Sequence, residues 1–568
     1  RVGALVLEGG AVRATGTGNV SLVGAGGTGS GIGNDGVMIA DGTVGTQGTG
    51  DVSIRGVATL GTGISFAGTT ATLGDVAMTG DMTLRADTFD NTAGALSILR
   101  AGGGGTVTFR TDNDATTIGV AGGTGTAQIT AAMIGAVSGF EQVHVGFPSQ
   151  TGAIDTGPLT MTRNLWLQTD GTITTGALTM GANELDVANG AAFTQTGALA
   201  STGLVKFSGT GDVTATHASN TFEYLEIDKN NPANVTVSTT APLDLSYVTM
   251  DTGALWITAP GISQAAPAIT NGAATFDAGT GSVILTDPSN AFAGPVRFVT
   301  TGVGSVALNN VVATDFGGGN TTVAGDLTVV SNGAITQVSD LVIGGSVDLS
   351  SAAGITLANA GNDVTANVTL TAIGNAIWRE IGAVSLGPVV AATLDVQSGG
   401  AITQVAAIAT GAATFDSGAN AITLNDAGNV FAGAVTLATT GAADASLAAV
   451  GPVDLAASSV AGNLTVVKSG AGDLTQSGPL TVGGNLSANA GGGLILLNQG
   501  ANAIAGTVSL DSTGAGTNIF QNGAPLALGT VAITGNLDVT ANTGAITQTT
   551  AMTVGGDANF TAGAFAIT

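Results

Sequence analysis

The chain has 568 residues, of which 44% are hydrophobic and only 9% are charged, with 92 glycines and no cysteine. The lack of cysteine excludes disulfides, thiolate metal sites and cysteine nucleophiles. The net charge is -26, from 12 basic and 38 acidic residues, which argues against nucleic acid as a partner because phosphate binding needs clustered basic groups. So much aliphatic surface with so little charge also excludes a disordered chain.

Hydropathy and the chain ends give two further expectations. No run of about eighteen apolar residues occurs, so the sequence predicts no membrane-spanning helix in this segment. The sequence does not open with a charged segment followed by an apolar stretch, so we do not expect a signal peptide in it. The sequence opens at Arg1 and stops at Thr568 inside a copy of its own repeat, so we expect a processed or excised segment of a longer protein.

Residues 1–150 contain irregularly spaced turn motifs. "GTGNVSL" begins at Gly16 and its relative "GTGDVSI" only at Gly48. We expect an irregular N-terminal β-solenoid segment here, with an uncertain register.

Residues 151–260 carry a shorter and more regular interval. "TGPLTM" begins at Thr156, "TGALTM" at Thr175 and "TGALAS" at Thr196. A turn of about twenty residues, as these positions indicate, is typical of one rung of a parallel β-solenoid, with short strands joined by corners.

Residues 261–568 contain a longer repeat of about 72 residues, marked by "GAITQ" and its relatives. The repeat glutamines are Gln264, Gln337, Gln404, Gln476 and Gln548. Between them, apolar and polar residues alternate with the period of half-buried strands. A Gly-Gly pair between two short strands marks a tight corner or bulge where no side chain fits.

These patterns predict an all-β chain that folds as a parallel β-solenoid with rungs of about 19–24 residues, about 27 rungs in all. The alternative is a row of β-sandwich domains of about 72 residues, each of which needs a buried Trp or Tyr. The three tryptophans, Trp166, Trp256 and Trp378, do not follow the repeat. This observation favours the solenoid.

The repeat glutamines have two interpretations. Three rungs would separate successive glutamines by about 14 Å, because strands stack about 4.8 Å apart, so their amides cannot form a continuous ladder. We therefore expect each amide to turn to a corner and to bond backbone groups there. A periodic contact with a ligand is the alternative.

One stretch is a candidate metal site. "TDNDATT" places Asp112, Asn113 and Asp114 together, and their oxygens could hold calcium. The same residues could form an Asx-rich turn. The stretch "GIGNDG" at Gly31–Gly36 is similar to one turn of a calcium-binding nonapeptide repeat, but such repeats act in tandem and this copy is single. Apart from this calcium, the sequence predicts no cofactor.

Sequons of the form N-x-S/T are candidates for glycosylation. They include Asn234, Asn367, Asn463, Asn485 and Asn559. An outward asparagine followed two positions later by an outward threonine gives the same pattern in an alternating strand without any glycan. Both interpretations remain open.

The blocks "GAITQ…LTVGGNLS" and "GTGNVSL…GNDGVMIA" resemble the β-strand repeats of filamentous-haemagglutinin-like bacterial surface proteins, which are two-partner-secreted exoproteins and autotransporter passengers. The resemblance covers most of the chain and is clearest over residues 261–568. It implies a right-handed parallel β-helix, export to the bacterial cell surface or beyond, and a role as an adhesin stalk or fibre. It also implies partners on cell surfaces or in the extracellular matrix, or further copies of the chain in a fibre or homo-oligomer.

We therefore expect a non-enzymatic structural or adhesive fibre segment. One alternative is a β-helix that binds or cleaves polysaccharide, which predicts a lateral groove where several carboxylates and aromatic platforms converge. A further alternative is a self-assembling component of a sheath or surface layer, which differs from the fibre in the lateral contacts between copies.

Overall fold

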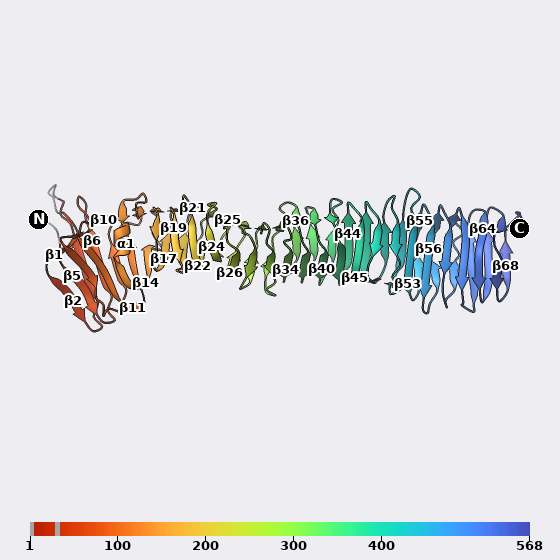
Figure 1. Ribbon diagram of the computed structural model, residues 1–568, viewed down its shortest axis with the longest axis horizontal. Coiled ribbons are helices and arrows are strands. Elements are labelled where there is room, and N and C mark those ends of the chain that lie inside the picture. Colours follow the sequence, from red (N-terminus) through yellow and green to blue (C-terminus); the bar gives the residue numbers. More distant parts are fainter. Residues whose placement is uncertain (1–4, 29–33) are drawn as a thin grey trace. The chain divides into compact units, whose positions relative to one another are not determined.

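The computed structural model describes residues 5–28 and 34–568 and is almost entirely β (Figure 1). The strands pair in parallel and stack into a β-solenoid of about 24 turns with about 21 residues per rung. The predicted solenoid is confirmed. The tandem-sandwich alternative is wrong, because the described strands pair with strands about one rung away in the sequence, in continuous stacks rather than in separate sandwiches.

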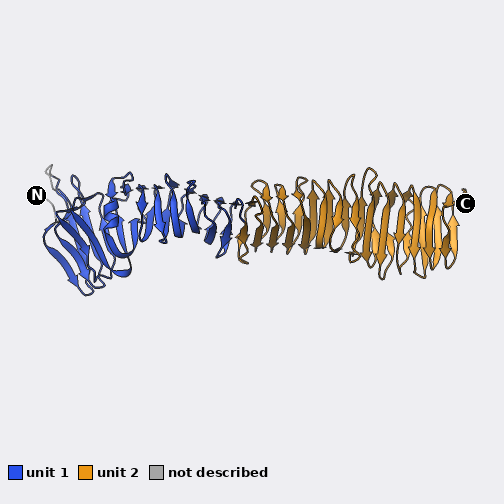
Figure 2. Ribbon diagram, in the orientation of Figure 1, with its two compact units in different colours: residues 1–281 blue, residues 282–568 orange. Residues whose placement is uncertain are grey.

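The chain divides into two compact units, unit 1 at Arg1–Gly281 and unit 2 at Ser282–Thr568 (Figure 2). Both contain two long parallel sheets, called sheet 1 and sheet 2 below. The boundaries that sequence spacing placed after residues 150 and 260 rest on a different criterion and stay predictions.

Unit 1 begins with long rungs. Val20 pairs with Val52, Val52 with Met82 and Met82 with Val107, so the motifs at Gly16 and Gly48 lie on adjacent rungs. The rung length that the sequence predicted is too short for this segment. Longer rungs here are one reason why the chain makes fewer turns than expected.

Unit 1 also contains a short four-stranded sheet with β1 (Leu5–Glu8), β4 (Val37–Ala40), β7 (Ile64–Ala67) and β10 (Phe89–Asn91). Sheet 1 of unit 1 contains β2 (Ala11–Thr15), β3 (Val20–Ala25), β5 (Thr43–Gln47), β6 (Val52–Val57), β8 (Thr70–Gly74), β9 (Met82–Arg85), β11 (Ala95–Arg110), β14 (Val137–Gly146), β16 (Leu159–Thr160), β17 (Asn164–Thr169), β19 (Leu178–Gly181), β20 (Leu185–Asn189), β22 (Leu199–Ser208), β24 (Thr221–Lys229), β26 (Leu243–Met250), β28 (Ile262–Gln264) and β29 (Ala268–Thr270). Sheet 2 of unit 1 contains β12 (Ile118–Val120), β13 (Ala127–Ile129), β15 (Ile154–Thr156), β18 (Ile173–Thr175), β21 (Phe193–Gln195), β23 (Val213–Ala215), β25 (Val235–Ser238), β27 (Leu255–Thr258) and β30 (Ala274–Asp277).

A short helix interrupts the strands of unit 1. Helix α1 (Ala131–Gly135) starts after Thr130, whose Oγ1 accepts a hydrogen bond from the Met133 amide at 3.2 Å. A threonine in this position is a usual N-cap. The helix is too short for a helical period to be seen in the sequence. Within the described part of the chain, no helix has the length and apolar character needed to cross a membrane.

Sheet 1 of unit 2 contains β31 (Val283–Leu285), β32 (Ala291–Phe292), β34 (Val306–Asn310), β37 (Leu327–Ser331), β40 (Val347–Ser351), β43 (Asn367–Ala372), β45 (Val384–Ala391), β47 (Ile402–Gln404), β48 (Ile408–Thr410), β50 (Ile422–Leu424), β51 (Val430–Phe431), β53 (Ala445–Val450), β56 (Leu464–Ser469), β59 (Leu486–Asn489), β62 (Thr507–Ser512), β64 (Leu526–Ile533), β66 (Ile546–Gln548) and β67 (Met552–Val554). Sheet 2 of unit 2 contains β33 (Val296–Val299), β35 (Thr314–Phe316), β36 (Thr321–Val323), β38 (Ile335–Gln337), β39 (Leu341–Ile343), β41 (Ile355–Leu357), β42 (Asp363–Val364), β44 (Asn375–Glu380), β46 (Thr393–Ser398), β49 (Ala413–Asp416), β52 (Ala434–Ala438), β54 (Val453–Leu455), β55 (Ser458–Val460), β57 (Leu474–Gln476), β58 (Leu480–Val482), β60 (Ile495–Leu497), β61 (Ala503–Ile504), β63 (Thr517–Asn522), β65 (Asn536–Ala541) and β68 (Ala558–Thr561).

The long repeat of unit 2 spans three and a half rungs. Gln337 lies on sheet 2, Gln404 on sheet 1, Gln476 on sheet 2 and Gln548 on sheet 1. Seven strand-to-strand steps separate β38 from β57 and β47 from β66, so two repeats make seven rungs. The expectation of three rungs per repeat is therefore wrong, and successive repeats present the same motif on opposite sheets.

The core consists of aliphatic side chains stacked in register along each sheet. Leu327, Val347 and Val368 pair in succession and are fully buried. The residues next to them on each strand point outward. Close stacking also explains the Gly-Gly corners. A Cβ atom on Gly344 or Gly483 would overlap a backbone carbonyl of the preceding rung, at Ala324 and Ala461 respectively, so no side chain fits there.

Candidate functional site

The five predicted glutamines all lie at corners and bond the backbone there. Each Nε2 donates to the carbonyl two residues further on, at 2.7 to 2.8 Å, and the acceptors are Ala266, Ser339, Ala406, Gly478 and Thr550. A glutamine side chain thus replaces a backbone partner at the turn. The structure assigns these amides a place in the corner, as the first of the two interpretations predicts.

Asparagine side chains complete several of these corners. Gln337, Gln404 and Gln476 each exchange two hydrogen bonds, at 2.8 to 2.9 Å, with an asparagine more than one rung later in the sequence. The partners are Asn362, Asn429 and Asn502. Gln195 and Asn220 form the same pair in unit 1, at 2.9 and 3.3 Å. We call each reciprocal pair an amide clamp.

Asn429 shows what a clamp holds. It is fully buried, and its Oδ1 accepts from the Ile408 amide at 2.8 Å as well as from Gln404. Its Nδ2 also donates to the carbonyls of Ala448 at 2.9 Å and Leu424 at 3.3 Å. One side chain therefore joins three successive rungs and satisfies buried backbone groups at each corner.

Sequence reasoning did not find the asparagine partners. Their interval from glutamine exceeds one rung, so no match of repeat to repeat points to the contact. A signal was present, because the two matching copies "DPSNAFAG" and "DAGNVFAG" both retain the asparagine, at Asn290 and Asn429.

The candidate calcium residues form a turn with arginine partners. The Asp112 carboxylate lies 2.6 Å from Nε of Arg55 and 2.7 Å from Nε of Arg85. The hydrogen bond from Arg55 lowers the pKa of the Asp112 carboxyl. Asn113 Oδ1 accepts from the Ala115 amide at 3.1 Å, which is an Asx turn.

The third candidate, Asp114, accepts a hydrogen bond from Ser149 Oγ at 3.4 Å, on another segment. Across the described residues, no group of three or more His, Asp or Glu side chains is arranged to hold a metal ion. Gly31–Gly33 of the "GIGNDG" stretch lie outside the described residues. Calcium binding stays a prediction, and the geometry at Asp112 favours the turn.

The sequon asparagines connect neighbouring rungs. Asn234 Oδ1 accepts from the Ala254 amide at 3.0 Å, and Asn367 Oδ1 accepts from Ser385 Oγ at 2.9 Å. Asn559 Nδ2 donates to Asp538 Oδ1 at 2.8 Å. Glycosylation at these positions stays a prediction, and the structure adds a separate role for each carboxamide.

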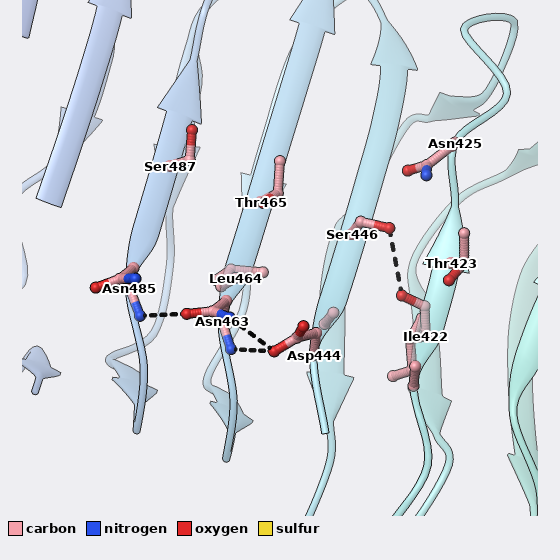
Figure 3. Close-up of a pocket in the computed structure, with 12 residues that line it drawn as sticks. Ile422, Thr423, Asn425, Asp444, Ser446, Asn463, Leu464, Thr465, Asn485 and Ser487 are labelled. Atoms are coloured by element: carbon pink, nitrogen blue, oxygen red, sulfur yellow. Dashed lines mark hydrogen bonds between the residues drawn. The ribbon is translucent and has the colours of Figure 1, made fainter. Parts of the chain in front are cut away.

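Two more sequon asparagines border a polar groove in unit 2 (Figure 3). Asp444 Oδ1 accepts from both the amide and Nδ2 of Asn463, and Asn463 Oδ1 accepts from the Asn485 amide at 2.8 Å. The groove has a volume of about 520 Å³ and includes the outward hydroxyls of Thr423, Ser446, Thr465 and Ser487, which lie in register on four rungs. Most of its amide groups are therefore engaged in joining the rungs.

A different set of side chains gathers on the outer face of sheet 1 in unit 1. Strands β17, β20, β22, β24 and β26 stack side by side there (Figure 1). One outward row passes from Trp166 to Asp186, Lys206, Glu226 and Tyr247, each paired with the next. Beside it run the outward residues Glu184, Tyr224, Asp228 and Asp244. We call these nine residues the aromatic–acidic face.

Both tyrosines of the chain belong to this face. Tyr224 is 44% exposed and Tyr247 is 40% exposed. Tyr224 pairs across the strands with Asp244, and Glu226 pairs with Tyr247, so each ring has a carboxylate as its direct cross-strand neighbour. Five carboxylates and one ammonium group make the face acidic.

The groups of the face differ in their pairing and burial. Lys206 Nζ forms an ion pair with Glu226 at 2.8 Å. Burial raises the pKa of Asp186 to about 6. Trp166 stacks on His144, with ring centroids 4.1 Å apart and planes at 14°, and burial lowers the pKa of His144 to about 4. The end of the face at Trp166 is therefore tightly packed, while the two tyrosines remain accessible.

Three ionisable side chains point into the solenoid instead. Lys229 is fully buried, and its Nζ donates to Asn189 Oδ1 at 2.9 Å and to the Ser208 carbonyl at 2.7 Å. Burial lowers the pKa of Lys229 to about 8. Lys468 in unit 2 is buried in a similar way and donates to the carbonyls of Gly470 and Ala490.

The third buried group is a carboxyl. Glu380 accepts hydrogen bonds from the Val364 amide at 2.7 Å and from Nε1 of Trp378 at 3.0 Å. Burial raises the pKa of Glu380 to about 7. These groups are enclosed by the rungs and serve the corners, so none is placed to meet a ligand.

Six consecutive segments of the chain match a family described as Repeats of unknown function (DUF5649), at residues 162–225, 232–299, 303–371, 374–438, 442–511 and 515–568. Successive segments start at about the same interval as the repeat glutamines, so one family repeat corresponds to about three and a half rungs. Comparisons with curated proteins and with solved structures gave no significant match.

Proposed function

The chain belongs to the family of Repeats of unknown function (DUF5649), and from this premise we propose that it is a non-enzymatic structural segment of an extracellular or bacterial cell-surface fibre with an adhesive role. The resemblance to filamentous-haemagglutinin-like exoproteins supports this assignment. Its partners are then components of cell surfaces or of the extracellular matrix, or further copies of the chain.

The observation that carries the proposal is the use of polar side chains to join rungs. The clamps at Gln337, Gln404 and Gln476 and the asparagines of the polar groove all connect successive turns. Because these side-chain amides hydrogen-bond across successive rungs, the corners resist unfolding. This property suits a segment that has to bear load or hold parts apart.

A second candidate function is polysaccharide binding, and the aromatic–acidic face favours it. The sequence-based alternative required carboxylates and aromatic groups to converge in a lateral groove. Tyr224, Tyr247, Glu226 and Asp244 supply these groups side by side on an outer sheet face, which supports the binding part of this alternative. The two candidates are compatible, because an adhesive fibre needs a contact surface.

Three measurements test the proposal. Immunolabelling of intact cells of the source organism should place the protein outside the cell. When the purified protein is incubated with polysaccharides, it should bind them without cleaving them, so no new polysaccharide ends should appear. Release of shorter or unsaturated products would contradict a non-enzymatic role. A sedimentation coefficient that rises steeply with protein concentration would instead favour the sheath or surface-layer alternative.

A further inference from the structure

The aromatic–acidic face of unit 1 has features that point to a particular ligand chemistry. It offers only side chains, because β22, β24 and β26 are hydrogen-bonded to neighbouring strands on both sides. A peptide that binds as an added strand needs free main-chain groups at a sheet edge. The ligand must therefore be recognised by side chains alone.

The rings and carboxylates alternate across two rungs. Tyr224 and Glu226 lie on β24, and Asp244 and Tyr247 lie opposite them on β26, so the tyrosines occupy diagonal positions. Diagonal neighbours in a sheet are about 7–8 Å apart, within reach of aromatic side chains. A ring-shaped group held against one tyrosine is thus also within reach of the carboxylate beside it and of the second tyrosine.

The charge of the face further restricts the class of ligand that can bind there. Glu226 is paired with Lys206 at 2.8 Å, but Glu184, Asp186, Asp228 and Asp244 add four more carboxylates to the face and no second cation. One oxygen of Asp244 accepts from Ser263 Oγ at 3.1 Å. A neutral or anionic polymer would leave this excess charge uncompensated, whereas ammonium groups would pair with it and would also be attracted to the tyrosine ring faces.

The row also has a direction. From Trp166 to Tyr247 it crosses five successive strands, with steps of about 4.8 Å along the stack. A linear polymer lying along the stack would meet a carboxylate or a ring on almost every rung. A compact ligand would use only one or two of them.

From these observations we propose that the aromatic–acidic face binds a linear glycan whose sugar units carry free amino groups. Sugar rings stack through their C–H faces on Tyr224 and Tyr247, and their ammonium and hydroxyl groups bond the neighbouring carboxylates. This inference rests on the proposed binding role of unit 1 and names its ligand class.

Titration calorimetry on the full chain tests the inference with three probes. A glucosamine oligosaccharide, at a pH where its amino groups are protonated, should bind. The N-acetylglucosamine oligosaccharide of the same length should bind at least about tenfold more weakly, since it lacks the ammonium groups. An oligolysine of equal charge should also bind more weakly, because it has no sugar ring to stack.

Variants of the face identify the groups responsible. The double substitution Tyr224→Ala and Tyr247→Ala should lower the affinity for the glucosamine oligosaccharide by about tenfold or more, and the corresponding double Phe variant should keep it within about threefold. Trp256→Ala is the matched control, since this residue is 46% exposed but lies on β27 of sheet 2. Glu226→Gln should weaken binding, and Asp170→Asn, at an exposed carboxylate outside the face, should not.

The outcomes separate the inference from the proposed function. Equal binding of the acetylated oligosaccharide would overturn the amino-sugar inference and leave glycan binding in place. Equal binding of oligolysine would overturn it in favour of charge alone. If no glycan binds while the protein is still found at the cell surface, the inference fails and the structural role stands. Unfolding curves of each variant confirm that these outward substitutions leave the fold unchanged.

Discussion

Unit 1 and unit 2 are built from the same kind of rung but place their chemistry differently. In unit 1, the outer face of sheet 1 presents both tyrosines of the chain, a tryptophan, a lysine and five carboxylates. In unit 2, the corresponding outward rows contain small hydroxyl groups such as Thr423, Ser446 and Thr465, and the single tryptophan, Trp378, is buried.

The difference between the units lies in the outward positions of a shared kind of rung. Corners and inward rows are constrained by stacking in both units, since the amide clamp of Gln195 and Asn220 in unit 1 has the same form as those of unit 2. Outward positions are free of that constraint, so unit 1 can present charged and aromatic groups without altering the core. The small hydroxyl groups on the outward rows of unit 2 fit the structural role that we propose.

The largest effect is expected from breaking a clamp in unit 2. Asn429→Ala removes hydrogen bonds to Gln404, Ile408, Leu424 and Ala448 and leaves buried backbone groups without partners. The cost should be about 3 kcal/mol, measured by native-state hydrogen exchange at the amides of β47, β48 and β53.

Asn425→Ala is the control for this substitution, because Asn425 lies close in sequence but is exposed. It should change the same exchange rates by less than about 0.5 kcal/mol. Equal effects of the two substitutions would mean that the clamp does not hold the rungs.

The stability of unit 2 should depend on pH through Glu380, a buried carboxyl of its core. Burial raises the pKa of Glu380 to about 7 from its ordinary value of 4.5, so between these values the folded chain binds more protons than the unfolded chain. The contribution of Glu380 to stability should therefore be highest below pH 4.5 and fall by about 2 kcal/mol as the pH rises to about 7. Urea unfolding followed by Trp378 fluorescence, with Trp166 and Trp256 replaced by Phe, reports on this region.

In Glu380→Gln the loss of stability between pH 4.5 and 7 should disappear from the Trp378 signal. Glu141→Gln, at an exposed carboxylate, should leave it in place. A profile that is the same with and without Glu380 would show that this carboxyl does not couple folding to pH.

Lys229 in unit 1 should give a pH dependence of the opposite direction. Burial lowers the pKa of Lys229 to about 8 from 10.5, so the folded chain binds fewer protons than the unfolded chain between these values. Stability followed through Trp166 and Trp256, in a Trp378→Phe variant, should rise by between about 1 and 2 kcal/mol as the pH increases from about 8 to about 10. Lys229→Met should abolish the rise, and its persistence would assign the effect to other groups.

The smallest effect is expected from calcium. The Asp112 carboxylate already pairs with Arg55 and Arg85, so adding calcium or a chelator should shift unfolding of unit 1 by less than about 0.5 kcal/mol. A larger stabilisation that is lost in Asp114→Asn would instead establish the calcium site predicted from the sequence.

The sequence predicted the solenoid because its two signals are local. Alternation along each short strand and a rung of about twenty residues both follow from nearest neighbours. The half-rung in the repeat could not be predicted in the same way. The interval between Gln404 and Gln476 divides into three or three and a half rungs equally well until the strand pairing is known.

The candidate face could have been found in the sequence. Trp166, Asp186, Lys206, Glu226 and Tyr247 follow one another at the rung interval already seen in that segment. The row was missed because Lys206 is distant in sequence from the carboxylate that it contacts.

The partner of Gln404 was hidden for a related reason, since Asn429 lies more than one rung away. A contact of this kind depends on how the corners of adjacent rungs overlap. Neither alternation nor the rung interval contains that information.

Hydrogen exchange of the whole chain, followed by mass spectrometry with and without a glucosamine oligosaccharide, tests the division of roles most directly. Ligand should slow exchange in peptides covering β20, β22, β24 and β26 and leave those of unit 2 unchanged. Protection that appears in unit 2, or equally in both units, would contradict the account in which unit 1 carries the contact face and unit 2 supports it.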